Sequence, residues 1–333
     1  MARSSAPPFL GLVRLLLILL PSVLIYGAPQ PLRISDYNSS FTGYPDVILI
    51  GVQKGGTTSL AYFLVVMMKL YVESWDNKEQ HFFSFFFNDA AFDRYISGFD
   101  WSKKQHGDRP TFDASPSYFS QAITWENMKR LYSPESLRKK KFILTLREPT
   151  IRDISWYRHF HGQAVKDSMR NGHSEDEGDV RGTFHDYVSD MKARGKRPGE
   201  YLRDLKRTLG VIRRDQLFII SFEALTGAKE QDTINRLLYF LGHKAIYFRG
   251  SVFPQRNAAE GHCGEFCDEA DLHEFLCADL RYLNDTYSAT NEGLFEFINN
   301  DPNRPVSEPE FLPFTERISE KCIEDDGSLV DFS

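Results

Sequence analysis

Residues 46–60 constrain the fold of this chain more than any other stretch of it. They read Asp-Val-Ile-Leu-Ile-Gly-Val-Gln-Lys-Gly-Gly-Thr-Thr-Ser-Leu. Residues 47–50 form a short apolar run, which predicts a buried β-strand. A glycine-rich turn follows over 51–56, and Thr57 then begins an apolar segment that predicts a helix. A strand, a glycine turn and a helix in direct succession indicate the first unit of an α/β fold.

The same turn predicts an anion-binding loop around Lys54. Glycines let backbone N–H groups approach a phosphate, the start of a helix adds a partial positive charge, and the lysine adds a full one. The usual nucleotide triphosphatase loop is G-x-x-x-x-G-K-[ST], with its lysine directly before the Ser or Thr. Here the lysine precedes the glycine pair. The turn therefore predicts a phosphate site of a different kind.

The order Lys-Gly-Gly-Thr-Thr, starting at Lys54, resembles the 5′-phosphosulfate loop of sulfotransferases that use 3′-phosphoadenosine 5′-phosphosulfate. It is most similar to the Golgi carbohydrate class, which includes the heparan sulfate sulfotransferases. The resemblance implies that Lys54 neutralises the leaving phosphate. It also implies that the 5′-phosphate is held by the residues that follow the lysine, namely Gly55, Gly56, Thr57, Thr58 and Ser59.

A second predicted strand, residues 141–146, delivers Arg147 to its carboxyl end. Ser155 lies about two helical turns farther on. An arginine offers a planar fork that matches phosphate oxygens, and a serine hydroxyl can donate to the same group. The pattern R-[DNE]-P-x5-S resembles the 3′-phosphate element of the same family, which implies that Arg147 and Ser155 hold that phosphate. From the residues alone, a surface ion pair of Arg147 with Glu148 or Asp153 is the alternative.

Residues 78–83 read Lys-Glu-Gln-His-Phe-Phe and resemble a segment of the heparan sulfate class. The resemblance implies that Glu79 is the catalytic base, because an attacking hydroxyl or amine must lose a proton. Packing against Phe82 and Phe83 is expected to make this carboxylate more basic by desolvation. His81 is the rival base, since imidazole titrates nearer neutrality. Without the resemblance, a solvated charged surface is the alternative.

Residues 113–119, Asp-Ala-Ser-Pro-Ser-Tyr-Phe, also resemble the family, but Ala114 stands where heparan sulfate enzymes carry a lysine. This departure puts a heparan acceptor in doubt and favours a neutral glycan or another hydroxyl acceptor. The usual basic loop that covers the cofactor is missing, and Arg256 is the nearest basic residue to it. The resemblance extends over about residues 45–300.

The rest of the chain predicts a P-loop-like parallel sheet with helices on both faces, in a single domain. Ligands of such sheets bind beyond the carboxyl ends of the strands, so we expect Lys54 and Arg147 to share one rim. We also expect a solvated loop over 166–182. The predicted strands are 47–50, 141–146 and 217–221, and the predicted helices are 57–70, 150–161, 199–208 and 232–241.

The N-terminus predicts a secretory-pathway segment over 1–28, because basic residues flank a short apolar run. A signal-anchor in the Golgi membrane and a cleaved signal peptide, which would leave a secreted protein, both remain open. A short lumenal stem is expected over 29–44, the sulfotransferase domain over 45–300, and an acidic tail over 301–333. Two N-glycosylation sequons, at Asn38 and Asn284, fit a lumenal location.

The cysteines lie in the last quarter of the chain. In an oxidising lumen they can form two disulfides with three possible connectivities, and Cys322 would tie down the tail. A zinc site that combines the first two cysteines with His262 and His273 is the alternative. The four are Cys263, Cys267, Cys277 and Cys322.

Together these features predict a sulfotransferase that uses 3′-phosphoadenosine 5′-phosphosulfate, needs no metal and modifies a carbohydrate hydroxyl or amine. A formal net charge of −6 argues against nucleic-acid binding. Two other functions stay open. The first is a catalytically inactive lumenal relative that binds glycans. The second is a P-loop nucleotide kinase, which would require magnesium. The sequence does not predict an oligomeric state.

Overall fold

The computed structural model describes six stretches of the chain, namely 33–37, 40–73, 79–170, 183–251, 275–318 and 320–332. Within them, only the backbone is described for residues 161–170. The predicted N-terminal segment, Asn38, Arg256, Cys263 and Cys267 lie outside them. Within these stretches, no helix is both long enough and apolar enough to cross a membrane.

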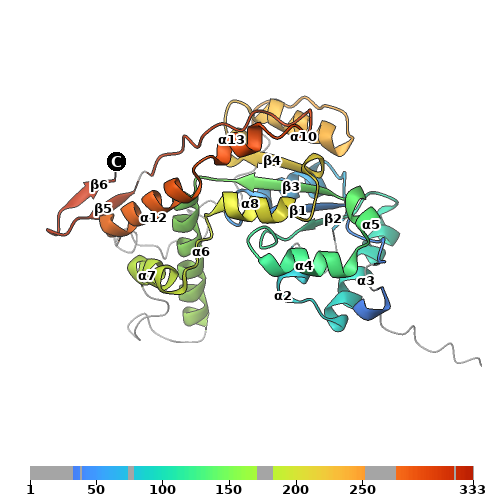
Figure 1. The fold of residues 1–333 in the computed structure, drawn as a ribbon, viewed down its shortest axis with the longest axis horizontal. Helices are drawn as coiled ribbons and strands as arrows, with labels where there is room; N and C mark the ends of the chain where they lie inside the picture. The colour runs from blue at the N-terminus through green and yellow to red at the C-terminus, as the bar shows by residue number, and fades with distance from the viewer. Residues whose placement is uncertain are drawn as a thin grey trace, which may run out of the picture.

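Four parallel strands form the central sheet in the order β2-β1-β3-β4 (Figure 1). The predicted α/β fold with a parallel sheet is therefore confirmed. The three strands expected from the sequence are β1, β3 and β4, and β2 is an addition. The strands are β1 (Val47–Gly51), β2 (Phe112–Ala114), β3 (Lys141–Leu146) and β4 (Leu217–Ser221).

Helices cover both faces of this sheet (Figure 1). One face packs against α2 (Phe82–Phe85), α3 (Asp89–His106), α4 (Ala122–Leu131), α8 (Tyr201–Leu209) and α13 (Leu294–Asn299). The other packs against α1 (Thr57–Tyr62) and α10 (Glu230–Leu241), with α9 (Phe222–Thr226) beside them. The remaining helices are α5 (Pro134–Lys139), α6 (Pro149–Arg170), α7 (Phe184–Arg194) and α12 (Cys277–Thr290).

Alternation along the strands explains why their sequences are apolar at nearly every position. Successive side chains point to opposite faces. In β1, Ile48 and Ile50 enter one core cluster, whereas Val47 and Leu49 enter the other. A strand covered on both faces has no solvent side, so it reads as a continuous apolar run.

Strand β2 was not predicted from the sequence, because it is short and contains a charged residue. It has only three residues and contains Asp113, which is 1% exposed. Ala114 is the last residue of the strand and is fully buried in the core beneath α1. A lysine at position 114 would therefore have to leave this core to reach a substrate.

Two predicted segments differ from the structure. The helix expected over 57–70 is α-helical only to Tyr62 and continues as a π-helical turn over Phe63–Met67. Its second half is not fully buried, because Val66 and Met67 are 49% and 46% exposed. The loop expected from residue 166 is helical as far as Arg170, since α6 continues that far. Lysine, methionine and arginine near its end are good helix formers, so charge alone did not indicate a loop.

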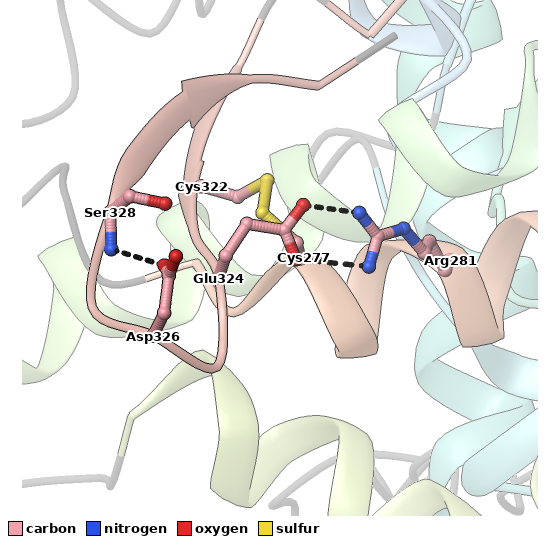
Figure 2. Close-up of a disulfide and its surroundings, with 6 residues drawn as sticks. All are labelled: Cys277, Arg281, Cys322, Glu324, Asp326 and Ser328. Atoms are coloured by element: carbon pink, nitrogen blue, oxygen red, sulfur yellow. Dashed lines mark hydrogen bonds and ion pairs between the residues drawn. A yellow bond between two sulfur atoms is a disulfide. The ribbon is translucent and has the colours of Figure 1, made fainter.

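Residues beyond 300 lie against the rest of the fold. Glu308 is 2% exposed and pairs with Arg214, and it also accepts a 2.8 Å hydrogen bond from the N–H of Ile219. A disulfide joins Cys322 to Cys277 at the start of α12 (Figure 2). The predicted tie through Cys322 is confirmed.

Two short antiparallel strands, β5 (Lys321–Ile323) and β6 (Leu329–Asp331), pair at the disulfide, because Cys322 is the middle residue of β5. Arg281 of α12 forms an ion pair with Glu324 in the turn between these strands (Figure 2). Asn284 is exposed on the same helix. Its glycosylation remains a prediction.

Candidate functional site

Thr145 of β3 makes two hydrogen bonds to the start of the loop between β1 and α1. The N–H of Val52 donates to the Thr145 carbonyl at 2.8 Å, and the Thr145 hydroxyl donates to the Gly51 carbonyl at 3.0 Å. A further bond of 3.0 Å closes the turn from the Gly55 N–H to the Val52 carbonyl. These bonds hold the loop at the carboxyl ends of the two central strands.

The glycine pair is required by space and by backbone conformation. A Cβ at Gly55 would lie 2.9 Å from Val52 Cγ2 and 3.1 Å from the Thr145 carbonyl oxygen. Gly56 has φ of 85°, a left-handed conformation that favours glycine. Lys54 adopts φ of 68°, which is uncommon for a residue with a side chain. Helix α1 begins at the next residue after the pair, so its first N–H groups face this turn.

The hydroxyl residues that begin α1 differ in exposure. Thr57 and Ser59 are each 4% exposed, whereas Thr58 is half-buried. Ser155 lies about two turns along α6 and is half-buried. The roles of these residues in holding phosphates stay predictions.

Three charged side chains from distant segments act on one another at this rim. Burial and the positive charge of Arg147 lower the pKa of the Lys54 amine to about 8, while the negative charge of Glu79 opposes that shift. A lysine feels such charges only when they lie nearby. Arg147 and Glu79 therefore both lie within electrostatic reach of Lys54. Lys54 and Arg147 also follow the carboxyl ends of the neighbouring strands β1 and β3, as we expected.

Arg147 is held by a residue from the far end of the chain. Its Nε and Nη2 donate to the Glu316 carboxylate at 3.0 Å and 2.5 Å. Its guanidinium also stacks 4.6 Å from the ring centre of Phe222, the first residue of α9. The alternative pairing with Glu148 or Asp153 is wrong, since the described partner of Arg147 is Glu316. Any anion that binds this guanidinium must share or replace that contact.

Glu79 and His81 lie together, as their spacing suggests. Nε2 of His81 is 3.4 Å from Glu79 Oε2, and the two side chains are 19% and 32% exposed. Phe82 and Phe83 instead point into the core, where Phe82 stacks on Tyr95 at 4.7 Å. The expectation that these two rings desolvate Glu79 is therefore not supported.

Sequence reasoning missed several residues around this rim. The segment after β2 contributes Ser115 and Ser117, which contact His81, yet the sequence assigned them no role. Phe222 directly follows β4, so the rule that sites lie at strand ends could have identified it. No local pattern pointed to Glu316. Across the described stretches, no group of three or more His, Cys, Asp or Glu side chains could hold a metal ion.

Comparison with known proteins shows which family this chain resembles. The family model described as "Sulfotransferase domain" matches residues 44–253. The chain is 36% identical over 117 residues to heparan sulfate glucosamine 3-O-sulfotransferase 5 of Mus musculus, covering 34% of this chain and 30% of that protein. It is 27% identical over 210 residues to bifunctional heparan sulfate N-deacetylase/N-sulfotransferase 1 of Mus musculus, covering 59% and 22%. The chain thus spans less than a third of the length of either relative.

Among solved structures, the chain is similar to a sulfotransferase from Alicyclobacillus acidocaldarius. The two are 21% identical with a TM-score of 0.45, and the match covers 73% of this chain and 96% of that one. The family model alone spans more than half of the chain, from before β1 to beyond α10. The chain therefore belongs to the sulfotransferase domain family.

Proposed function

We propose that this protein transfers a sulfuryl group from 3′-phosphoadenosine 5′-phosphosulfate to a hydroxyl or amine of a carbohydrate. The observation that carries the proposal is that Lys54 and Arg147 follow the carboxyl ends of two neighbouring strands, with Arg147 and Glu79 both within electrostatic reach of Lys54. Two cations there suit the two phosphorylated ends of the donor, and a carboxylate beside them suits an acceptor that must lose a proton. The family and the two heparan sulfate relatives support the same reaction.

On the donor side, the N–H groups of the loop over 55–58 hold the 5′-phosphate at the start of α1. Lys54 lies beside the oxygen that links this phosphate to sulfur. When that sulfur–oxygen bond breaks, the electron pair stays on the phosphate oxygen, and the ammonium neutralises the charge that develops there. Arg147 and Ser155 hold the 3′-phosphate. Catalysis of this kind is mostly positioning and charge stabilisation.

On the acceptor side, the attacking oxygen or nitrogen forms its bond to sulfur opposite the leaving phosphate. Its proton passes to the Glu79 carboxylate at the same stage, so that charge balances on both sides. Glu79 is the base in this scheme because it lies within the electrostatic reach of Lys54. The proposed acceptor is a glycan or glycosaminoglycan.

The test has a binding arm and a transfer arm. Titration calorimetry with the product nucleotide 3′-phosphoadenosine 5′-phosphate should show binding without magnesium, and ATP with magnesium should bind more weakly. Radiolabelled donor offered to a panel of neutral glycans and desulfated glycosaminoglycans should label at least one of them. Product binding with no labelled glycan would favour the inactive glycan-binding relative. Preference for the triphosphate would favour the kinase.

Two variants separate the proposed roles. Lys54→Ala should lower turnover more than it weakens product binding, because the charge it neutralises develops in the transition state. Arg147→Ala should chiefly weaken product binding, because its charge holds a phosphate present throughout. Near wild-type activity in both variants would contradict the assignments.

We further propose that the domain works in the Golgi lumen, anchored by the N-terminal segment if that segment is not cleaved. The disulfide between Cys277 and Cys322 supports an oxidising compartment. Microscopy of the full chain with a C-terminal tag, together with mass analysis of its N-terminus, tests the location and the cleavage.

A further inference from the structure

A chain of side-chain hydroxyls leads from the interior of the protein to the ring of His81. Nδ1 of His81 lies 2.7 Å from Ser117 Oγ, which in turn lies 2.7 Å from Ser84 Oγ. Both serines are buried, at 1% and 8% exposure. On the other side of the ring, Nε2 faces the Glu79 carboxylate. The imidazole therefore connects a buried serine pair to the proposed base.

The backbone of His81 is held by a second buried group. Its N–H donates to Ser115 Oγ at 3.0 Å, and that hydroxyl donates to Asp113 Oδ1 at 2.6 Å. Asp113 is anchored by the hydroxyls of Tyr95 and Tyr118 at 2.7 Å and 2.9 Å. His81 has φ of 52°, a conformation that a residue with a side chain seldom adopts. These bonds therefore help to set the direction in which the ring leaves the chain.

Two directions are open to the hydroxyl protons of this chain. Each serine has a single proton to donate. The Ser84 hydroxyl lies 3.2 Å from the His81 carbonyl but 2.7 Å from Ser117. That carbonyl already accepts from the N–H groups of Ser84 and Phe85 at 3.1 Å and 2.9 Å. The Ser84 hydroxyl can therefore donate to the His81 carbonyl or to Ser117, and the Ser117 hydroxyl can donate to Ser84 or to Nδ1 of His81.

The other end of the ring decides between these two directions. A neutral imidazole whose Nδ1 accepts a hydrogen bond carries its proton on Nε2. Nε2 is the nitrogen that lies 3.4 Å from Glu79 Oε2. An ionised carboxylate is attracted by an N–H and repelled by a nitrogen lone pair. The Glu79 contact therefore favours the tautomer with its proton on Nε2, in which Ser117 donates to Nδ1.

We infer that Ser117 is a positioning residue for sulfuryl transfer, which fixes the tautomer of His81 so that its Nε2–H orients the Glu79 carboxylate. The inference rests on the proposed function. It makes His81 a donor to the base, so His81 is no longer a rival for that role. As the acceptor bonds to sulfur, its proton passes to Glu79, and the N–H of His81 keeps its place.

Removing the Ser117 hydroxyl frees the ring to adopt the other tautomer, with a lone pair turned toward the carboxylate. Acid reverses this defect, because a protonated imidazole carries a proton on both nitrogens. Two charged groups are described around His81. The Glu79 carboxylate lies 3.4 Å from its Nε2. The other group is Asp113, whose pKa is raised by burial and lowered by the charge of His81. A loss of activity that shrinks as the pH falls is therefore the signature of a tautomer effect.

The first experiment reads the tautomer directly. The full chain is labelled with ¹⁵N in its histidine rings, and His81→Gln identifies the signal of interest. At a pH where this histidine is neutral, the wild type should show a proton on Nε2, and Ser117→Ala should show a mixture. A wild-type proton on Nδ1 overturns the inference, whatever the variant does.

The second experiment measures kcat, acceptor KM and product binding across pH. Ser117→Ala should lower kcat about tenfold at neutral pH, which is a part of the roughly 10²–10⁴-fold that general acid–base catalysis contributes. The deficit should narrow in acid, and the affinity for 3′-phosphoadenosine 5′-phosphate should not change. Ser120→Ala is the matched control, since its hydroxyl bonds only the Ser117 carbonyl in the described contacts. It should behave like the wild type.

The outcomes separate this inference from the proposed function. If the wild type neither binds the product nucleotide nor transfers sulfate, the proposed function fails. If the wild type does both and Ser117→Ala keeps full kcat, or loses it equally at every pH, only the positioning role fails. Ser117→Thr retains a hydroxyl and should retain the Nε2–H tautomer, which covers the case in which the alanine variant misfolds.

Discussion

The lowered pKa of Lys54 predicts an alkaline limb in the pH profile of the free enzyme. With a pKa of about 8, this amine is about nine-tenths protonated at pH 7 and about one-tenth at pH 9. An ordinary lysine, at 10.5, would stay almost fully protonated over that range. Because only the ammonium can neutralise the leaving phosphate, kcat/KM for the donor should fall about tenfold between these two pH values.

Two substitutions test whether the alkaline limb arises from deprotonation of Lys54. Lys54→Arg keeps a positive charge at every accessible pH, so any activity it retains should lack the limb. Arg147→Gln removes the like charge that helps to lower the pKa of Lys54, so the midpoint of the limb should move upward. Arg147→Lys is the matched control because it keeps the charge. The position of the limb is the quantity to compare, since donor binding also weakens in these variants.

Initial rates at low donor concentration, taken from pH 6 to pH 10, measure the limb. The profile of kcat should have its limb at higher pH, because the anionic donor stabilises the ammonium once bound. NMR titration of ¹³C-labelled lysine side chains gives the same pKa without any turnover. A pKa near 10 for Lys54 by that method would refute the argument that burial and Arg147 lower its pKa. An alkaline limb that persists in Lys54→Arg would refute it too.

Three further substitutions test other contacts. Glu316→Gln weakens the pair with Arg147, so 3′-phosphoadenosine 5′-phosphate should bind about fivefold more tightly by calorimetry. Weaker binding would mean that the carboxylate orients the arginine instead. Cys322→Ser opens the bridge to Cys277 and should lower the free energy of unfolding by about 2–4 kcal/mol in urea denaturation. Glu308→Ala leaves a buried arginine unpaired and should cost about 3–5 kcal/mol by the same method, and an unchanged midpoint would contradict this.

The sequence predicted those parts of the fold that local patterns determine. Strand β4 was expected over its full length, and helix α10 was expected to end before Gly242, which has φ of 89°. Both follow from apolar periodicity and from the conformational freedom of glycine within a few neighbouring residues. The loop at Lys54 belongs to the same class, because its glycines and lysine are adjacent in the chain.

Prediction failed where local composition competed with burial from distant segments. Strand β2 has three residues and a buried aspartate, so its strand character comes from pairing with β1 and not from an apolar run. The apolar sequence after residue 57 predicted a regular helix as far as residue 70. Its far end is partly exposed, because the sheet covers only one side of it.

By itself, the sequence determined the chemistry that each strand end can offer: a lysine with its glycines, an arginine, and a glutamate with its histidine. Only the tertiary structure decided which of these meet and in what state. The strand order brings Arg147 near enough to Lys54 to lower its pKa, and a carboxylate 169 residues away, Glu316, pairs with that arginine. Electrostatic and hydrogen-bond energies depend on distance in space and on burial, and neither is encoded by position along the chain.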